Sequence, residues 1–231
     1  MDAPEALHFF DRYDCFESAG DATRSRLRYD AIVGCNYEMF QDARVLNLNS
    51  SDGRWCLAAL DAGASYVVGV DASRRAVENA TATFNEYGIT AGSFNFLNSE
   101  LTAALKGMTA GEFDLILCAQ SFELFDPRVL FGYMYRLAPK HVILDTTVSR
   151  GDGPIVRFDY KVRDASAPKG TRRHGAIVAT PNHELIGLLC EYFRFNWRQI
   201  DWQAMGISDW TGVHDYERGR RSTYVLDRLS P

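Results

Sequence analysis

The sequence predicts an α/β fold: a mostly parallel sheet of seven strands with helices on both faces, an antiparallel last strand and a small inserted β-hairpin. Three observations predict it. Short apolar runs alternate with stretches of helical periodicity between residues 43 and 147. Two segments within residues 154–179 alternate in the manner of paired strands. The last two apolar runs have no helix between them, which predicts an antiparallel pair.

Five strands and four helices are expected in the first two thirds of the chain. The strands are expected at residues 44–49, 65–71, 93–98, 113–119 and 141–148. The helices between them are expected at residues 53–63, 73–88, 99–107 and 126–138. Strands separated by helices need right-handed crossovers, so these five are predicted to run parallel, with both faces of the sheet covered.

Small polar residues, glycine and proline mark the ends of these helices. Ser73 stands near the start of the second helix, and Ser99 and Asp126 are the expected N-caps of the third and fourth. Pro127 follows Asp126 at the first helical position, where its missing N–H costs nothing. Gly88 is the expected stop of the second helix.

The whole chain, residues 1–231, is expected to be one domain built on a cofactor-binding core at residues 43–147. Residues 1–40 hold a helical stretch that begins after Asp21, and they are expected to form an N-terminal helical lid. The later elements are expected at 154–179 for the inserted hairpin, 181–193 for a helix, and 194–202 and 222–229 for the final strands. The long connection at 204–221 is expected to be a closing loop.

The composition describes a folded protein. Hydrophobic residues make up 46% of the 231 positions and aromatic residues 13%. The net charge of −5 argues against a broad nucleic-acid-binding surface. Acidic residues exceed basic ones up to Thr147, and basic residues exceed acidic ones after it. That excess either attracts an anionic substrate or is solvated surface charge.

Five scattered cysteines form no CxxC pair, so neither a disulfide framework nor a zinc site is expected. The first ten residues, MDAPEALHFF, are acidic where a signal peptide would be basic. No apolar run is long enough to span a membrane. A cytoplasmic location is therefore expected, and metal-assisted catalysis is not.

The turn after the first strand, NLNSSDG at residues 47–53, lies where open parallel sheets bind ligands. Asp71 ends the second strand and can accept hydrogen bonds from both hydroxyls of a ribose. A dinucleotide site needs the motif GxGxxG so that a pyrophosphate can lie against bare backbone, and that motif is missing. The turn therefore favours a nucleoside without phosphate.

Two stretches resemble the class I S-adenosylmethionine-dependent methyltransferases, which have a Rossmann-like fold. They are VLNLNSSDGRWCLAALDAGASYVVGVDAS at residues 45–73 and FDLILCAQSFELFDP at residues 113–127. The resemblance covers about residues 43–147 and implies S-adenosylmethionine as the cofactor.

The resemblance also implies roles for the residues of the first turn. Gly53 matches the last glycine of the family motif, beside the methionine part of the cofactor. Asn49 and Ser51 stand where that motif has earlier glycines. Asn47 stands where an acid usually faces the methionine amino group, and it keeps an acceptor oxygen without the charge. Asp71 matches the acid that binds the ribose hydroxyls.

Further roles follow from the same resemblance. Asn98 matches the residue that binds the adenine amino group. The other implied contacts are Ala72 beside the adenine, Ser99 next to Asn98, Cys118 and Ala119 with carbonyls facing the methionine amino group, and Arg28 or Tyr29 closing over the methionine carboxylate.

Methyl transfer to a hydroxyl usually needs a base within hydrogen-bond reach, whereas an amine needs only to be neutral. Three residues are candidates for catalysis. Asp145 stands near the carboxyl end of the fifth strand, where it acts as a base, binds the acceptor or caps the next turn. His174 either faces the acceptor or lies in a basic surface turn. His214, beside Asp215 in the closing loop, is the third candidate.

The expected function is methyl transfer to an oxygen or nitrogen of a small-molecule acceptor of anionic or aromatic character. Neither a membrane nor nucleic acid is an expected partner, and a homodimer is left open. Two alternatives remain. One is a tRNA- or RNA-modifying methyltransferase, and the other is a non-catalytic binding protein with an altered cofactor motif.

Overall fold

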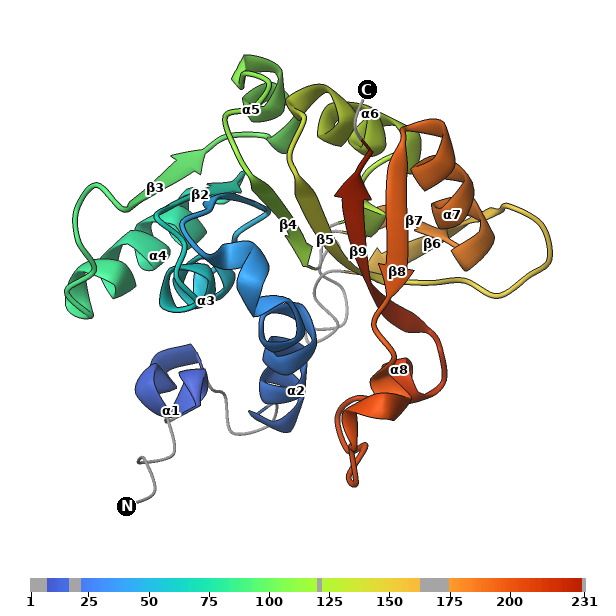
Figure 1. Cartoon of the computed structure of the whole chain (residues 1–231), viewed down its shortest axis with the longest axis horizontal. Coiled ribbons are helices and arrows are strands. Elements are labelled where there is room, and N and C mark those ends of the chain that lie inside the picture. The colour runs from blue at the N-terminus through green and yellow to red at the C-terminus, as the bar shows by residue number, and fades with distance from the viewer. Residues whose placement is uncertain (1–7, 17–21, 120–121, 163–174, 230–231) are drawn as a thin grey trace, which may run out of the picture.

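The computed structural model describes residues 8–16, 22–119, 122–162 and 175–229. Its main sheet has seven strands in the order β3-β2-β1-β4-β5-β9-β8, and a separate two-stranded sheet pairs β6 with β7 (Figure 1). The strands are β1 (Arg44–Leu48), β2 (Tyr66–Asp71), β3 (Phe94–Asn98), β4 (Leu115–Ala119), β5 (His141–Thr147), β6 (Val156–Val162), β7 (Gly175–Pro181), β8 (Phe195–Gln199) and β9 (Arg221–Arg228).

The helices surround the sheet. The α-helices are α1 (Phe9–Arg12), α2 (Ala22–Ile32), α3 (Arg54–Asp61), α4 (Arg74–Glu86), α5 (Leu101–Gly107), α6 (Pro127–Leu137), α7 (His183–Tyr192) and α8 (His214–Glu217). The short 3-10 helices are η1 (Asp14–Phe16), η2 (Gly34–Phe40), η3 (Phe122–Leu124) and η4 (Trp202–Met205).

The predicted fold class is confirmed. Strands β1 to β5 pair in parallel, and β9 is antiparallel to both β5 and β8. Strand order reverses between β1 and β4, so the carboxyl ends of these two strands lie side by side at the switch point where such sheets bind ligands. In Figure 1, α2 and α8 lie at this edge, beyond the ends of β4 and β5.

Alternation along the strands divides the core between the two faces of the sheet. Val45 and Leu46 are neighbours in β1 and both are fully buried, yet they belong to different apolar clusters. Val45 packs with residues of α2, η2 and α3, and Leu46 packs with residues of α5, α6 and α7. Successive side chains of a strand point to opposite faces, and helices cover both faces of this sheet. Neighbouring residues are therefore both buried, so the strands are continuous apolar runs in the sequence.

Most predicted helix ends are confirmed. The Ser73 hydroxyl accepts from the Ala76 N–H, and the Asp126 carboxylate accepts from the Arg128 N–H. Gly88 follows α4 with φ +65°. The predicted cap at Ser99 is wrong: α5 begins at Leu101 with Glu100 as its N-cap.

Ser99 fails as a cap because its backbone is still joined to the sheet. Its N–H donates to the Asp71 carbonyl at 3.0 Å, and its hydroxyl donates to the Glu100 carbonyl instead of accepting from the helix. Asp21 lies outside the described residues, so the start predicted there for α2 stays a prediction.

Gly69 of β2 offers a test of this packing. A Cβ at this position would lie 2.6 Å from the Phe96 ring and 2.8 Å from Ser50 Cβ. Gly69→Ala is therefore expected to lower the free energy of unfolding by about 1–3 kcal/mol through overpacking. Gly107→Ala, where nothing lies within 4 Å, is the control and should change it by less than about 1 kcal/mol. Equal effects in urea titrations would contradict this packing.

Candidate active site

The turn between β1 and α3 has left-handed backbone at every second residue. Asn49 has φ +60°, Ser51 has φ +51° and Gly53 has φ +82°. The two side-chain-bearing residues cost more in this conformation than glycine would, with Asn the better tolerated of the two. The sequence thus keeps the backbone path of a glycine-rich turn while adding two side chains to it.

Neighbouring strands hold the turn in place. The Ser50 N–H donates to the Val70 carbonyl at 2.9 Å, and the Gly53 N–H donates to the Ser50 carbonyl at 2.9 Å. A Cβ on Gly53 would meet Ala80 and Phe96 at 3.0 Å each. Gly53 is required by its backbone conformation and by its close packing on α4 and β3.

Asp71 joins this turn to the next strand. Its Oδ2 accepts from the Ser51 N–H and its Oδ1 from the Ser73 N–H, both at 2.8 Å. The residue is only 8% exposed. A carboxylate offers about four acceptor positions, so each oxygen can accept one further hydrogen bond. Asp71 therefore fixes the turn and keeps the capacity to bind a diol.

Asn98 is placed beside Asp71 by the pairing of β2 with β3. Its Nδ2 donates to the Asp71 carbonyl at 3.2 Å and to the Ala72 carbonyl at 3.0 Å. Both amide protons are thereby directed to the backbone, which leaves Oδ1 as the acceptor on an exposed side chain. This arrangement suits an amino group such as that of adenine.

Asn47 is buried in β1 next to α3, and its predicted role at the methionine amino group stays a prediction. It is 1% exposed, and its Nδ2 lies 3.4 Å from the Cys56 sulfur of α3. Burial raises the pKa of the Cys56 thiol to about 12, so it stays protonated at neutral pH. Cys118 is buried within β4, and Ala119 ends that strand at the switch point.

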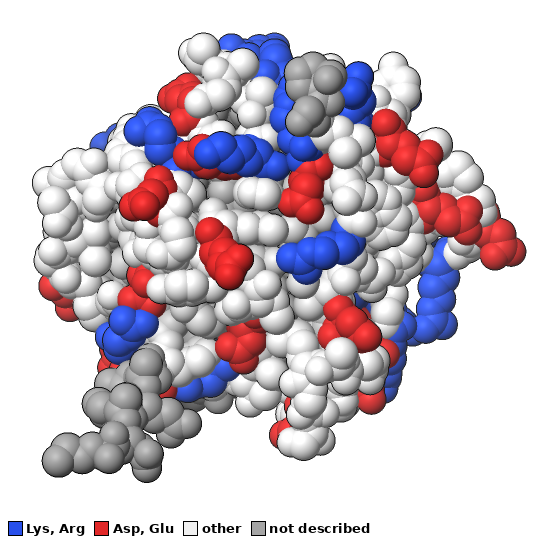
Figure 2. All heavy atoms as spheres, in the orientation of Figure 1, with Lys and Arg blue, Asp and Glu red and all other residues white. Residues whose placement is uncertain are grey.

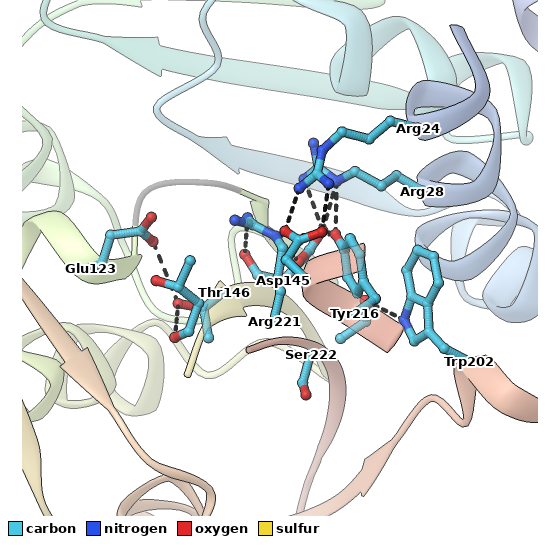
Figure 3. A network of polar contacts seen from close by, with 12 residues as sticks. Arg24, Arg28, Glu123, Asp145, Thr146, Trp202, Tyr216, Arg221 and Ser222 are labelled. Atoms are coloured by element: carbon cyan, nitrogen blue, oxygen red, sulfur yellow. Dashed lines mark hydrogen bonds and ion pairs between the residues drawn. The ribbon is translucent and has the colours of Figure 1, made fainter. Parts of the chain in front are cut away.

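A buried polar cluster joins α2, β5, α8 and β9 (Figure 3). Asp145 at its centre is fully buried. Arg28 donates to its Oδ2 from Nε at 2.9 Å and from Nη2 at 2.8 Å, and Arg221 donates to its Oδ1 at 2.8 Å. The Tyr216 hydroxyl donates to Oδ2 at 2.7 Å. The Arg28 guanidinium also lies 5.2 Å from the centre of the Trp55 ring.

The arginines decide the charge of Asp145. Burial alone raises the pKa of its carboxyl, but Arg221, Arg28 and Tyr216 outweigh burial and hold that pKa below its ordinary value. Burial and the negative charge of Asp145 raise the pKa of Tyr216. Asp145 is therefore a carboxylate and Tyr216 a neutral hydroxyl at neutral pH. A second ion pair, Arg24 with Asp215, joins α2 to α8 at 2.7 Å.

Tyr29 and His214 have partners outside this cluster. Tyr29 is half-buried and stacks on Phe9 with 5.1 Å between the ring centres, and burial raises its pKa to about 12. His214 is exposed and lies 2.9 Å from Glu217 rather than pairing with its neighbour Asp215. His174 lies outside the described residues.

The structure thus assembles some candidates and separates others. Hydrogen bonds join Ser51, Asp71, Ala72 and Asn98 at one edge. Asp145 is joined to Arg28. Their functional roles stay predictions.

Two residues near the ends of β4 and β5, Glu123 and Tyr216, are not among the candidates that the sequence predicts. Glu123, buried to 7% exposure, lies four residues beyond the end of β4, a place that the rule for open sheets singles out. No sequence signal marks Tyr216, which comes from the long closing segment.

A cavity of ≈ 420 Å³ lies beside η3, bounded by the start of α6 and by the β6–β7 hairpin. Its lining includes Glu123, Phe125, Arg128, Val156, Phe158 and Ile177. On the face that Figure 2 shows, basic and acidic side chains are interspersed. No helix in the described part of the chain has the length and apolar character to cross a membrane. Within the same residues, no three His, Cys, Asp or Glu side chains are grouped to hold a metal ion.

A comparison with protein families gives a match over the predicted cofactor-binding core. Residues 45–139 match a family model described as a methyltransferase domain. The search of curated proteins gave no match.

Solved structures resemble the chain over most of its length. A putative S-adenosylmethionine-dependent methyltransferase of Listeria monocytogenes has a TM-score of 0.61 at 12% identity, over 88% of this chain and 99% of that chain. Magnesium protoporphyrin IX methyltransferase of Synechocystis, solved with its bound cofactor S-adenosylmethionine, has a TM-score of 0.56 at 14% identity over 95% and 91%. The (4+2)-cyclase SpnF has a TM-score of 0.59 at 17% identity over 93% and 86%. At these identities the likeness establishes the fold.

The buried cluster leads to a prediction about stability. Asp145→Asn is expected to lower the free energy of unfolding by about 3–5 kcal/mol, because it leaves Arg28 and Arg221 buried without their shared carboxylate. Glu78→Gln, which breaks an exposed pair with Arg74, should cost less than about 1 kcal/mol. Urea titrations of the variants measure both changes, and a loss at Asp145 no larger than that at Glu78 would contradict the assigned cluster.

The lowered pKa of Asp145 also predicts a pH dependence. A carboxylate with a depressed folded-state pKa stabilises the fold above its unfolded pKa of about 3.9, and the contribution is lost as the pH falls through the folded-state value. The wild type should therefore lose stability below about pH 4 more steeply than Asp145→Asn does. Parallel acid limbs for the two proteins would show that Asp145 is not a paired carboxylate.

Proposed function

We propose that this chain, which belongs to the class I S-adenosylmethionine-dependent methyltransferase family, transfers a methyl group to an oxygen or nitrogen of a small-molecule acceptor. The observation that carries the proposal is the pair of acceptors at the carboxyl edge of β2 and β3. Asp71 keeps accepting capacity on both oxygens, and Asn98 presents Oδ1 beside it. Adenosine carries a ribose diol, which can donate to a carboxylate such as Asp71, and an amino group, which can donate to an amide oxygen such as Asn98 Oδ1.

The residues of this edge suit the adenosyl part of the cofactor. We assign the ribose hydroxyls to the Asp71 carboxylate, the adenine amino group to Asn98 Oδ1, and the adenine surroundings to Ala72 and Ser99. The turn around Gly53 passes beside the ribose. The assigned ligand carries no phosphate, so the turn does not need the GxGxxG motif that binds a pyrophosphate.

The methionine part is assigned to the ends of β1 and β4. The carbonyls at Cys118 and Ala119 lie at the switch point, where they can accept from its amino group. Arg28 of α2 contacts Trp55, the second residue of α3, which directly follows the turn, so we assign Arg28 to the methionine carboxylate. Asp145 holds two nitrogens of Arg28, so we assign it a positioning role. When bound, S-adenosylmethionine supplies a methyl group already activated by its sulfonium.

The acceptor is assigned to the space bounded by the N-terminal segment, the hairpin and the closing segment. A small molecule is favoured over RNA because the chain is acidic overall. His174 and His214 remain predicted bases for a hydroxyl acceptor. Positioning of the acceptor next to the methyl group supplies much of the expected acceleration.

A second candidate is a protein that binds the cofactor or a related nucleoside without methyl transfer. Asn49 and Ser51 favour it, since each adds a side chain where the ligand approaches the backbone. The cyclase among the structural relatives carries another chemistry on this fold. Release of S-adenosylhomocysteine in a screen of small hydroxyl and amine acceptors separates the two candidates.

Asp71→Ala tests the proposed cofactor site. It is expected to raise the dissociation constant of S-adenosylmethionine at least tenfold, because the ribose loses a charged acceptor and the turn loses its tie to β2. Asp52→Asn is the control on the same turn, where the carboxylate pairs with Arg54, and should stay within about threefold. Calorimetry with the cofactor and with S-adenosylhomocysteine measures both, and equal values for Asp71→Ala and wild type would refute the site.

A further inference from the structure

We propose that the cavity between η3, α6 and the hairpin binds an apolar acceptor carrying one hydroxyl, and that Glu123 takes the proton from that hydroxyl. This inference rests on the proposed function, because the methyl donor comes from that site. It places the acceptor on the hairpin side of the assigned space, adds its chemical class, and assigns the role of base to Glu123 in place of His174 or His214. The cavity volume of ≈ 420 Å³ is within the range of small-molecule sites, about 300–1,000 Å³.

One face of the hairpin forms the apolar wall. Val156 and Phe158 of β6, with Ile177 and Ala179 of β7, line the cavity at alternate positions. Phe158 lies directly opposite Ala179 in the register. Phe158 and Ile177 are each 69% exposed. Two large apolar side chains exposed on one face, above a cavity, are expected to be covered by a ligand.

Glu123 contributes a buried carboxylate to the lining of the cavity. The residue is 7% exposed, and the hydroxyl of the buried Thr146 donates to its Oε2 at 3.4 Å (Figure 3). Thr146 and the nearby Arg221 already stabilise this carboxylate, and a carboxylate has about four acceptor positions, so Glu123 can also accept a hydrogen bond from a ligand hydroxyl.

The charges at the rim do not favour an anionic acceptor. Arg128 is the cation that lines the cavity, and it donates to both carboxylate oxygens of Asp126, at 3.2 and 2.8 Å. Its charge is thereby balanced within the protein. With Arg128 balanced and Glu123 negatively charged, the cavity suits a neutral molecule. The sequence predicts an acceptor of anionic or aromatic character, and the cavity favours the aromatic one.

Glu123 lies close to the switch point. Ala119, assigned to the methionine part, pairs with Asp145 across β4 and β5, and Thr146 is the next residue of β5. The four residues from Ala119 to Glu123 span at most about 14 Å. Glu123 therefore lies no more than about 14 Å from the end of β4, and the proposal requires the acceptor in the cavity to extend from Glu123 toward the methyl group.

The proposed step is a displacement at the methyl carbon. A lone pair of the acceptor oxygen forms the new C–O bond while the C–S bond breaks and its electron pair returns to sulfur. The O–H proton passes to the Glu123 carboxylate. The products are the methyl ether, S-adenosylhomocysteine and a protonated Glu123, which returns its proton to water.

Binding of 2-naphthol to the wild-type chain without cofactor tests the cavity by itself. Phe158→Ala with Ile177→Ala is expected to weaken this binding at least tenfold, whereas Tyr192→Ala, an aromatic that is 78% exposed on α7, should leave it unchanged. Naphthalene, which lacks the hydroxyl, should bind about tenfold more weakly than 2-naphthol. No binding of 2-naphthol, or equal binding by all three proteins, would overturn the cavity assignment.

Methylation of 2-naphthol by S-adenosylmethionine tests the base. Glu123→Gln keeps an acceptor oxygen and is expected to lower kcat about 100-fold or more, with 2-naphthol binding changed less than tenfold. Glu191→Gln, an exposed carboxylate of α7, is the control and should keep wild-type kcat. Glu123→Asp, which retains the charge, should give an intermediate rate and serves as a second variant if Glu123→Gln does not fold.

The outcomes separate this inference from the proposed function. Bound 2-naphthol with no cofactor binding would refute the proposed function and leave the cavity standing. Cofactor binding and bound 2-naphthol without methylation would overturn the role of Glu123. A dimer measured by light scattering that dissociates in Phe158→Ala with Ile177→Ala would show that a second copy covers this wall, and would overturn the small-molecule assignment.

Discussion

The hydrogen bonds of the Asp71 carboxylate are the interaction on which the carboxyl edge of β1 and β2 depends. Its two oxygens hold the N–H groups of Ser51 and Ser73, so one side chain fixes the turn after β1 and the start of α4. Each such bond to a charged acceptor contributes about 1.5–3 kcal/mol. Two residues of the turn, Asn49 and Ser51, have the left-handed conformation at a cost of about 1–2 kcal/mol each, and the hydrogen bond to Asp71 offsets part of that cost. The proposed ribose acceptor is thus also the support of the ligand-binding turn.

Asp145 plays a corresponding part at the other side of the switch point. It is buried with Arg28 and Arg221, and Glu123 lies near enough to Arg221 to raise its pKa further. Two arginines and two carboxylates balance, which makes their burial tolerable. The cluster joins the N-terminal helix α2 to α8 and β9, segments far apart in the chain. It thereby sets the position of the elements that bound the proposed acceptor space.

The sequence predicts the sheet well because each β-α unit is local. Apolar runs, Ser73, Asp126 and Gly88 each depend on a few neighbouring residues, and strands separated by helices are predicted to run parallel. The strand order itself comes from the structure. Ser99 was misjudged because a longer-range bond to the Asp71 carbonyl holds its backbone in the sheet. The family resemblance singles out Asp71 and Asn98, and the structure pairs them at the ends of β2 and β3, while their roles stay predictions. The Asp145 cluster was not predicted, because its partners come from residues 28, 216 and 221, and their meeting depends on tertiary packing.

An adenosyl group without phosphate is proposed to bind at the carboxyl edge of β1 and β2. A crystal structure of the chain with S-adenosylhomocysteine tests it most directly. The account predicts the ribose hydroxyls within hydrogen-bond distance of the Asp71 carboxylate and the adenine amino group at Asn98 Oδ1. Density for the ligand at another place, or its absence at saturating concentration, would contradict the account.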